Sequence, residues 1–169
     1  MKLAVTDACI FIDLYDLQLT AQFFSLNMEV HTSVDVLKEL FENQQQMLAA
    51  FKSVGKLTAH IIREEDKLII LSTPYPKSLS DSDKTVLYLA NKLDAIVLSS
   101  DKTVRNAAKN NGIDYHGMIW IFDQLVSNNL ISKTAASAKL QQLITSNLVF
   151  QNNKELVAEM NKRLLLGKL

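Results

Sequence analysis

The sequence predicts an α/β fold, in which a three-layer parallel sheet of about five strands is flanked by helices and followed by a C-terminal helical extension. Short apolar runs alternate with longer segments of helical periodicity over residues 1–116, which is typical of βαβ units. Glycine and proline are scarce, with 4 and 2 residues, which disfavours an all-β chain with many tight turns. Beyond residue 117 every apolar pattern is helical.

Five apolar runs are short enough to be strands buried on both faces of a parallel sheet. They cover residues 3–6, 28–32, 57–61 and 95–99, with a weaker run at 113–116. Helical patterns lie between them at 10–25, 34–54, 62–72, 81–93 and 102–111, and after them at 117–129, 133–146 and 153–166. We therefore expect a single domain over residues 1–169, with an α/β core over 1–116 and the helices of 117–169 packed on that core.

The charge of the chain is balanced, with 18 basic and 18 acidic side chains and a formal net charge of zero. Zero net charge excludes a basic nucleic-acid-binding coat and an acidic disordered tail. The balance is uneven, since residues 1–83 carry 7 Lys/Arg against 12 Asp/Glu and residues 84–169 carry 11 against 6. The second half therefore supplies most of the cations that a polyanion would contact.

The chain holds one cysteine, so no internal disulfide can form and a reducing cytoplasm is the expected setting. The charge of Asp7 interrupts the first apolar run too early for a signal peptide. No apolar stretch approaches the ~18 uninterrupted residues that a membrane span needs.

Two carboxylates follow predicted strands directly, at the edge where open parallel sheets bind their ligands. Asp7 follows the run at 3–6, and Asp101 follows the run at 95–99. Each also has a purely structural interpretation, because Asp7 can be a turn residue and Asp101 can cap the helix that begins at Lys102. The sequence leaves both interpretations open.

Two further acids lie on predicted helices. Asp83 ends the sequence SDSD at 80–83, which resembles a capping box, yet it also lies on the apolar stripe that continues through Val86 and Leu87. Glu39 lies at the margin of the apolar face of its helix, which suits either a cleft rim or an ordinary surface residue. Four acids without a histidine or cysteine cluster favour a hard cation such as Mg²⁺ or Mn²⁺, and such a site acts on phosphodiesters.

Four motifs, in this order along the chain, resemble those of the PIN domain, and more narrowly its VapC-type toxin ribonucleases. They are VTD ending at Asp7, SVDVLKEL at 33–40, LSDSD at 79–83 and VLSSDKTVRNAA at 97–108. The tail that begins GMIWIFDQLV at 117–126 is similar to an uncharacterised toxin-like PIN subgroup. The resemblance covers the whole chain.

The resemblance implies a metal-dependent endoribonuclease, the toxin of a toxin–antitoxin pair, with a sheet in the order 3-2-1-4-5. By position, Asp7, Glu39, Asp83 and Asp101 are the catalytic acids that hold Mg²⁺ or Mn²⁺, and Ser99 hydrogen-bonds beside the metal. The implied reaction is hydrolysis by a water activated at the metal, leaving 5′-phosphate and 3′-hydroxyl ends. The family further implies a homodimer and a small antitoxin protein as partners.

The chain departs from the family directly after its first aspartate, where a small hydroxyl residue and then Asn or Ser are common. Ala8 and Cys9 stand there instead, so the supporting hydrogen bonds are expected to be missing or weakened. We interpret Cys9 as a small buried residue. A non-catalytic PIN-like scaffold that binds RNA or protein is the alternative that this departure favours, and a phosphohydrolase acting on small molecules is a third.

Basic residues flank two of the motifs. Lys84 follows Asp83, and Lys102, Arg105 and Lys109 follow Asp101. Such positions suit an RNA backbone that approaches an acidic metal site, although solvated helix faces explain each of these residues singly. The candidate RNA contacts are Lys84, Lys102 and Arg105.

Overall fold

The computed structural model describes residues 1–165. For residues 149, 164 and 165 it describes the backbone only. Its strands are β1 (Lys2–Thr6), β2 (Met28–Ser33), β3 (Leu57–His60), β4 (Ile96–Leu98) and β5 (Tyr115–His116). Its helices are α1 (Ala8–Asp16), α2 (Thr20–Phe24), α3 (Val34–Lys38), α4 (Glu42–Ser53), α5 (Glu64–Ser72), α6 (Asp81–Leu93), α7 (Lys102–Asn110), α8 (Met118–Ser127), α9 (Lys133–Ser146), α10 (Leu148–Asn152) and α11 (Lys154–Leu165).

The five strands form one sheet in the order β3-β2-β1-β4-β5, and every neighbouring pair is parallel. This confirms the predicted fold class and strand order. The central strands are apolar and buried because helices cover both faces of a parallel sheet. The carboxyl ends of β1 and β4 are adjacent, since Thr6 pairs with Leu98, and the residues that follow both strands therefore lie together.

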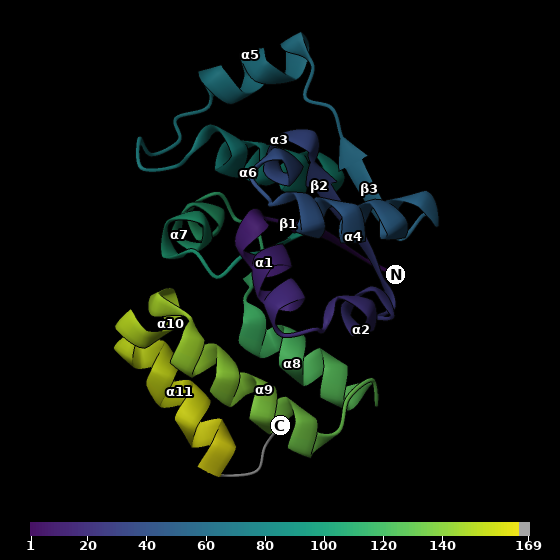
Figure 1. The fold of residues 1–169 in the computed structure, drawn as a ribbon. Helices are drawn as coiled ribbons and strands as arrows, with labels where there is room; N and C mark the ends of the chain where they lie inside the picture. Colours follow the sequence, from purple (N-terminus) through teal and green to yellow (C-terminus); the bar gives the residue numbers. More distant parts are fainter. Residues whose placement is uncertain (166–169) are drawn as a thin grey trace. The chain divides into compact units, whose positions relative to one another are not determined.

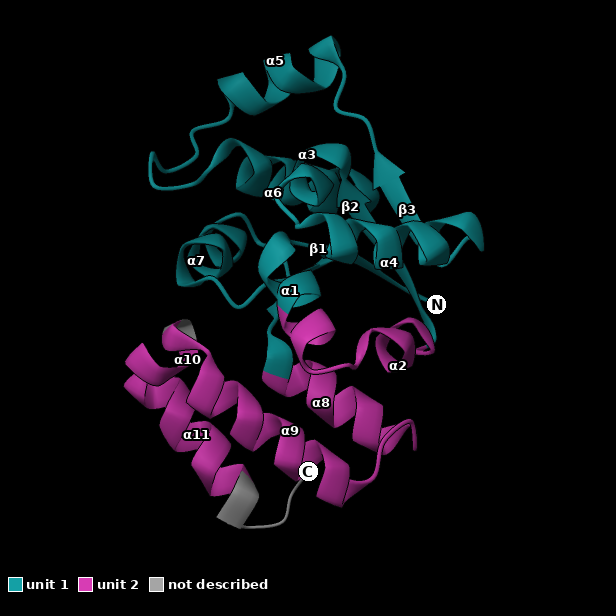
Figure 2. Ribbon diagram, viewed as in Figure 1, with its two compact units in different colours: residues 1–12, 27–118 teal, residues 13–26, 119–169 magenta. Residues whose placement is uncertain are grey.

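The described residues divide into two compact units (Figure 2). Unit 1 contains residues 1–12 and 27–118, which include the whole sheet, and unit 2 contains residues 13–26 and 119–169. The first turns of α1 thus belong to unit 1, whereas its end and α2 belong to the helical unit with the C-terminal helices. That residues 1–169 form a single domain stays a prediction.

Unit 1 is built around the sheet, with α6 packed along β1, β2 and β4 (Figure 1). Its core contains fully buried aliphatic residues from the central strands and from α6 and α7, including Val5, Val97, Leu87 and Val104. Burying each such side chain contributes roughly 1.5–3 kcal/mol relative to leaving it exposed. The buried core fixes the strand ends from which the loops of the candidate site begin.

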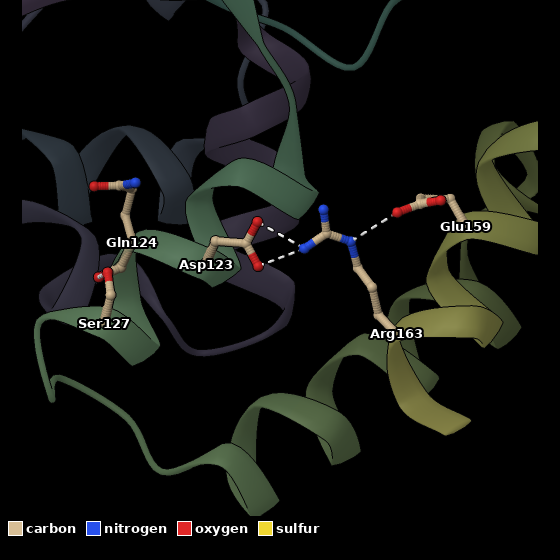
Figure 3. Close-up of polar contacts among 5 residues, drawn as sticks. All are labelled: Asp123, Gln124, Ser127, Glu159 and Arg163. Atoms are coloured by element: carbon tan, nitrogen blue, oxygen red, sulfur yellow. Dashed lines mark hydrogen bonds and ion pairs between the residues drawn. The ribbon is translucent and has the colours of Figure 1, made fainter. Parts of the chain in front are cut away.

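Unit 2 has its own helical core and its own polar contact. Fully buried side chains include Phe23, Phe122, Leu140 and Phe150. Arg163 of α11 donates from Nη1 to both carboxylate oxygens of Asp123 in α8, at 2.6 and 2.7 Å, and its Nε lies 3.2 Å from a carboxylate oxygen of Glu159. Figure 3 shows the guanidinium between the two acids. This ion pair joins α8 to α11 within unit 2.

Two predicted helices are interrupted in the structure, and one short helix was not predicted. The segment predicted at 10–25 breaks where Gln18 adopts a left-handed φ of 56°, which separates α1 from α2. The segment predicted at 34–54 breaks between α3 and α4, and residues before α11 form the short α10. Neither break in the first two segments is marked by glycine or proline, so periodicity alone did not reveal them. The last residue of the segment predicted at 153–166 lies outside the described residues.

The helix α5 is held to α6 by one aspartate. Asp66 accepts hydrogen bonds from the Tyr88 hydroxyl, from Lys92 Nζ at 3.1 Å and from the Arg63 backbone N–H at 2.9 Å. The Tyr88 bond, with the Arg63 and Lys92 contacts, lowers the pKa of Asp66 from 3.8 to about 2. Its contribution to stability is therefore present above the unfolded pKa and is lost as pH falls through the folded value.

We expect Asp66→Asn to loosen α5 at neutral pH, because the amide cannot accept from Tyr88 and Lys92 as a carboxylate does. Hydrogen exchange should show faster exchange of the α5 amides than in the wild type. Glu65→Gln is the matched control, because Glu65 is an exposed acid in the same helical turn. Equal protection of α5 in the wild type and Asp66→Asn would contradict the assigned role.

Candidate active site

The first two predicted acids lie at the shared carboxyl edge of β1 and β4. The backbone N–H of Asp7 donates to the Leu98 carbonyl at 3.2 Å, which extends the strand pairing by one residue. Asp101 follows three residues after Leu98 and begins α7. Parallel pairing of the two strands therefore brings their loops together, as the sequence predicted.

Asp7 is buried, with 4% of its surface exposed. Its Oδ1 accepts from the Cys9 thiol at 2.8 Å and from the Ile10 N–H at 3.3 Å, and its Oδ2 accepts from the Ser99 hydroxyl. Among the described residues no lysine, arginine or histidine forms a salt bridge with this carboxyl group. The turn-residue interpretation explains the Ile10 bond, but it does not explain why a carboxylate is buried without a cation.

Burial raises the pKa of Asp7 from 3.8 to about 6. The hydrogen bonds from Cys9, Ser99 and Ile10 oppose this shift, and the negative charge of Asp83 adds to it. Desolvation disfavours the charged form of a carboxyl group, and a nearby like charge does the same. A buried carboxyl group of this kind is stabilised by either a proton or a cation.

Asp101 is exposed and caps α7. Its Oδ1 accepts from the backbone N–H groups of Thr103 at 2.7 Å and Val104 at 3.1 Å, so the predicted capping role is present. Its own N–H donates to Ser99 Oγ at 3.0 Å, while that hydroxyl donates to Asp7. Ser99 therefore links the loops of the two acids, in the place where the sequence predicted a supporting hydroxyl.

The two remaining acids meet near the beginning of α6. Asp83 completes the predicted capping box, since the Ser80 N–H donates to its Oδ2 and the Asp83 N–H donates to Ser80 Oγ, both at 3.1 Å. Glu39 is the exposed residue that ends α3, and its Oε1 accepts from Ser82 Oγ at 2.5 Å. Ser82 thus joins Glu39 to the turn that carries Asp83, whose charge acts on Asp7.

The four acids occupy one region of unit 1 without forming a complete ligand set. Among the described residues, no three histidine, cysteine, aspartate or glutamate side chains are grouped so that they could hold a metal ion. The donor chemistry nevertheless fits a hard divalent cation, because the donors are carboxylate oxygens and the buried one has no cationic side-chain partner. Asp7, Glu39, Asp83 and Asp101 are the residues that would hold such an ion.

Two residues of this region were missed by the reasoning from sequence. Cys9 is half-buried, and the hydrogen bond that its thiol makes to Asp7 corrects our interpretation of Cys9 as a small buried residue. A donor is thus present where the departure from the family suggested that one was missing. Ser82 was not predicted either, although its position inside the SDSD motif was a signal that could have found it.

Two of the histidines, His31 and His60, pair with each other. Nδ1 of His31 and Nε2 of His60 lie 2.9 Å apart, within hydrogen-bonding distance. They stand on the neighbouring strands β2 and β3.

The predicted RNA contacts stand on the helices that follow Asp83 and Asp101 in the chain. Lys84 follows Asp83 in α6 and lies 3.8 Å from Asp81, and Lys102 is exposed at the first position of α7. Arg105 lies over the ring of Tyr115, with its guanidinium carbon 5.4 Å from the ring centre. One of the three cations therefore comes from α6 and two from α7.

The comparison with protein families decides what kind of domain this is. The model of a family described as a PIN domain (DUF3368) matches residues 3–164. The chain belongs to this PIN-domain family. A PIN domain is a nuclease-type fold.

Two solved structures align with most of this PIN domain. A PilT N-terminus domain protein from the hyperthermophilic archaeon Sulfolobus solfataricus P2 has a TM-score of 0.50 at 14% identity, over 73% of this chain and 93% of the other. A domain of a functionally unknown protein from Methanocaldococcus jannaschii DSM 2661 has a TM-score of 0.49 at 19% identity, over 69% of this chain and 91% of the other. No protein with a curated description matches the chain.

Within residues 1–165, no helix combines the length and the apolar character that a membrane crossing requires.

Proposed function

We propose that this PIN domain is a divalent-metal-dependent endoribonuclease of the VapC-like toxin branch. The observation that carries the proposal is the buried carboxyl group of Asp7, which faces the charge of Asp83 and has no salt-bridge partner among the described residues. Burying such a group is costly unless a proton or a cation compensates its charge. Mg²⁺ or Mn²⁺ is the compensating ion of this proposal.

The residues of the site have separate roles in the proposal. Asp7, Glu39, Asp83 and Asp101 hold the cation, and Ser99 orients Asp7 through the bond to Oδ2. When bound, the ion polarises the phosphodiester and activates water. Lys84, Lys102 and Arg105 bind the negatively charged RNA backbone and bring the scissile bond to the acids.

The test is cleavage of a structured RNA by the full chain with Mn²⁺, compared with the same reaction in excess chelator. We expect fragments with 5′-phosphate and 3′-hydroxyl ends that form only with the metal. Cleavage that continues in the chelator would overturn the metal dependence. Turnover of a generic phosphoester without a preference for RNA would favour the small-molecule phosphohydrolase.

If the three cations contact RNA phosphates, RNA affinity should fall as the salt concentration rises. Arg105→Ala should weaken binding and lower the slope of log affinity against log salt by about 0.7, because a single-stranded phosphate contact contributes about that much. The binding is measured in Ca²⁺ between 50 and 200 mM salt, and the exposed Lys154→Ala in unit 2 is the control. An unchanged slope in Arg105→Ala would show that Arg105 does not contact the RNA backbone.

A non-catalytic scaffold is the second candidate, and the absence of a grouped ligand set among the described residues favours it. A scaffold would bind RNA or protein without binding Mn²⁺ at millimolar concentration. The nuclease, in contrast, requires that a cation draw the four acids together. Direct measurement of Mn²⁺ binding therefore separates the two.

The proposal includes a second copy of the chain and a small antitoxin as protein partners. Its support is the surface of α5, where Leu68, Ile69 and Leu71 are 68%, 51% and 82% exposed. Exposed apolar side chains gathered on one helix are typical of an interaction surface. Light scattering of the full chain should give the mass of a dimer, and a monomer at all concentrations would contradict the homodimer.

A further inference from the structure

Cys9 contacts both loops that carry strand-end acids. Its thiol donates to Asp7 Oδ1 at 2.8 Å, and its sulfur accepts from the Ser100 N–H at 3.3 Å. Sγ also lies 3.9 Å from Ser99 Oγ. One sulfur atom therefore connects the loop after β1 with the loop after β4, across 91 positions in the sequence.

These contacts restrict Asp7 on both oxygens. Oδ1 accepts from Cys9 and Ile10, while Oδ2 accepts from Ser99. An ionised carboxylate has about four acceptor sites, so the three bonds leave about one for a further ligand. Without the thiol, Oδ1 would lose the shorter of its two bonds and keep the 3.3 Å bond from the Ile10 N–H.

The same sulfur also affects Asp101. The Ser100 N–H that donates to Cys9 and the Asp101 N–H that donates to Ser99 belong to consecutive residues. Together these two bonds fix the backbone just before α7, where the Asp101 side chain caps the helix. A change at Cys9 is therefore transmitted to two of the proposed metal-holding residues.

We propose that Cys9 is a positioning residue of the metal site, whose thiol orients Asp7 while its sulfur holds the Ser100 backbone. The inference rests on the proposed nuclease function and adds a residue to it. It states that the hydrogen-bonding capacity of the side chain at position 9 is needed, rather than its volume alone. Serine retains that capacity as both donor and acceptor, whereas alanine has neither.

The test is a calorimetric Mn²⁺ titration of the full chain as wild type, Cys9→Ser and Cys9→Ala. Partners that support metal ligands typically contribute about 10–100-fold in affinity, so Cys9→Ala should weaken Mn²⁺ binding by at least ~10-fold. Cys9→Ser should stay within roughly 3-fold of the wild type, since its hydroxyl offers the same donor and acceptor. Ser53→Ala, which removes an exposed hydroxyl bond at the end of α4, is the control and should change nothing.

If Cys9→Ala fails to fold, chemical modification of the Cys9 thiol in the folded wild type tests the same role. Methyl methanethiosulfonate transfers its CH3S group to the thiol, which forms the mixed disulfide Cys–S–S–CH3 and releases methanesulfinic acid; dithiothreitol reduces the disulfide and restores the thiol. Because Cys9 is the only cysteine, treatment should weaken Mn²⁺ binding in the wild type, reversibly, and leave Cys9→Ser unaffected. Circular dichroism before and after treatment checks that the fold is retained.

The outcomes separate this inference from the function on which it rests. Mn²⁺ binding by the wild type with equal affinity in Cys9→Ala and in the modified protein would overturn the role of Cys9 and leave the nuclease proposal standing. Equal weakening in Cys9→Ser and Cys9→Ala would also overturn it, because volume or polarisability would then matter instead of hydrogen bonding. A wild type that binds no Mn²⁺ would overturn the metal site itself, and with it this inference.

Discussion

Asp7→Asn is expected to reduce metal-dependent RNA cleavage by at least about 100-fold. Loss of a residue that only supports a metal ligand lowers activity by about 10–100-fold, and loss of a ligand should cost at least the upper end of that range. The amide fits the same space but carries no charge, and it replaces one acceptor oxygen with a donor. The structure makes this acid the most consequential of the four, because it is buried between β1 and β4 and contacts both loops through Cys9 and Ser99.

The measurement is single-turnover cleavage of one labelled RNA by equal concentrations of wild type and Asp7→Asn. Asp16→Asn is the matched control, because Asp16 is an exposed acid near the end of α1, and it should cleave at the wild-type rate. Equal rates for wild type and Asp7→Asn would sink the proposed catalytic role of the buried carboxyl group.

The same substitution is expected to have the opposite effect on the metal-free fold. The folded pKa of Asp7 is raised from 3.8 to about 6, so the carboxyl group contributes stability that is fully present below the unfolded pKa and is lost as pH rises through 6. A shift of about two pKa units corresponds to roughly 3 kcal/mol. Asp7→Asn should therefore be more stable than the wild type at pH 8, by up to about this amount, and should show little difference near pH 4.

Denaturant unfolding in chelator, from pH 4 to pH 8, measures this difference. Comparing the two proteins removes the contributions of His60 and His116, whose pKa values are lowered mainly by burial in both. The Ser99 hydroxyl can rotate to accept from the new amide, so the variant keeps its local hydrogen bonds. A stability difference that stays constant with pH would show that burial does not raise the pKa of Asp7.

Together, the two predictions state that Asp7→Asn loses RNA cleavage and gains stability at neutral pH. In the proposed nuclease, the acid that destabilises the metal-free protein at neutral pH is the one that binds the cation. A cation that binds only the folded chain stabilises it by mass action. The wild type should consequently gain stability from Mn²⁺, whereas Asp7→Asn should gain little.

Much of the fold was predictable because strands and helices leave local patterns. The helices predicted at 81–93 and 133–146 match α6 and α9 residue for residue, and all five strands appear within a few residues of their predicted ends. The interruption at Gln18 was not predictable, because its left-handed backbone has no glycine or proline signal. The strand order came from the family resemblance, since short buried strands carry no pairing information in their sequence.

The site was predictable to a lesser degree. The rule that ligands gather at the carboxyl ends of parallel strands placed Asp7 beside Asp101, and the structure joins them through Ser99. Glu39 was expected within a long helix, whereas it ends α3 and meets α6 through Ser82. Contacts such as these join residues far apart in the chain, which periodicity does not encode.

Cys9 shows this limit most clearly. Its small size and its place after Asp7 suggested packing, and the resemblance suggested a lost hydrogen bond. Only the pairing of β1 with β4 reveals that its sulfur meets Ser100. A residue that departs from its family therefore takes part in the network that surrounds Asp7.

Electron paramagnetic resonance of Mn²⁺ tests the central claim most directly, because protein-bound ions lose the sharp signal of the hydrated ion. Titrating the metal-free wild type should remove signal with a dissociation constant in the millimolar range or below, and Asp7→Asn should remove much less. We expect this difference before any RNA is added. An undiminished Mn²⁺ signal with the wild type at millimolar protein would contradict the metal site and favour the non-catalytic scaffold.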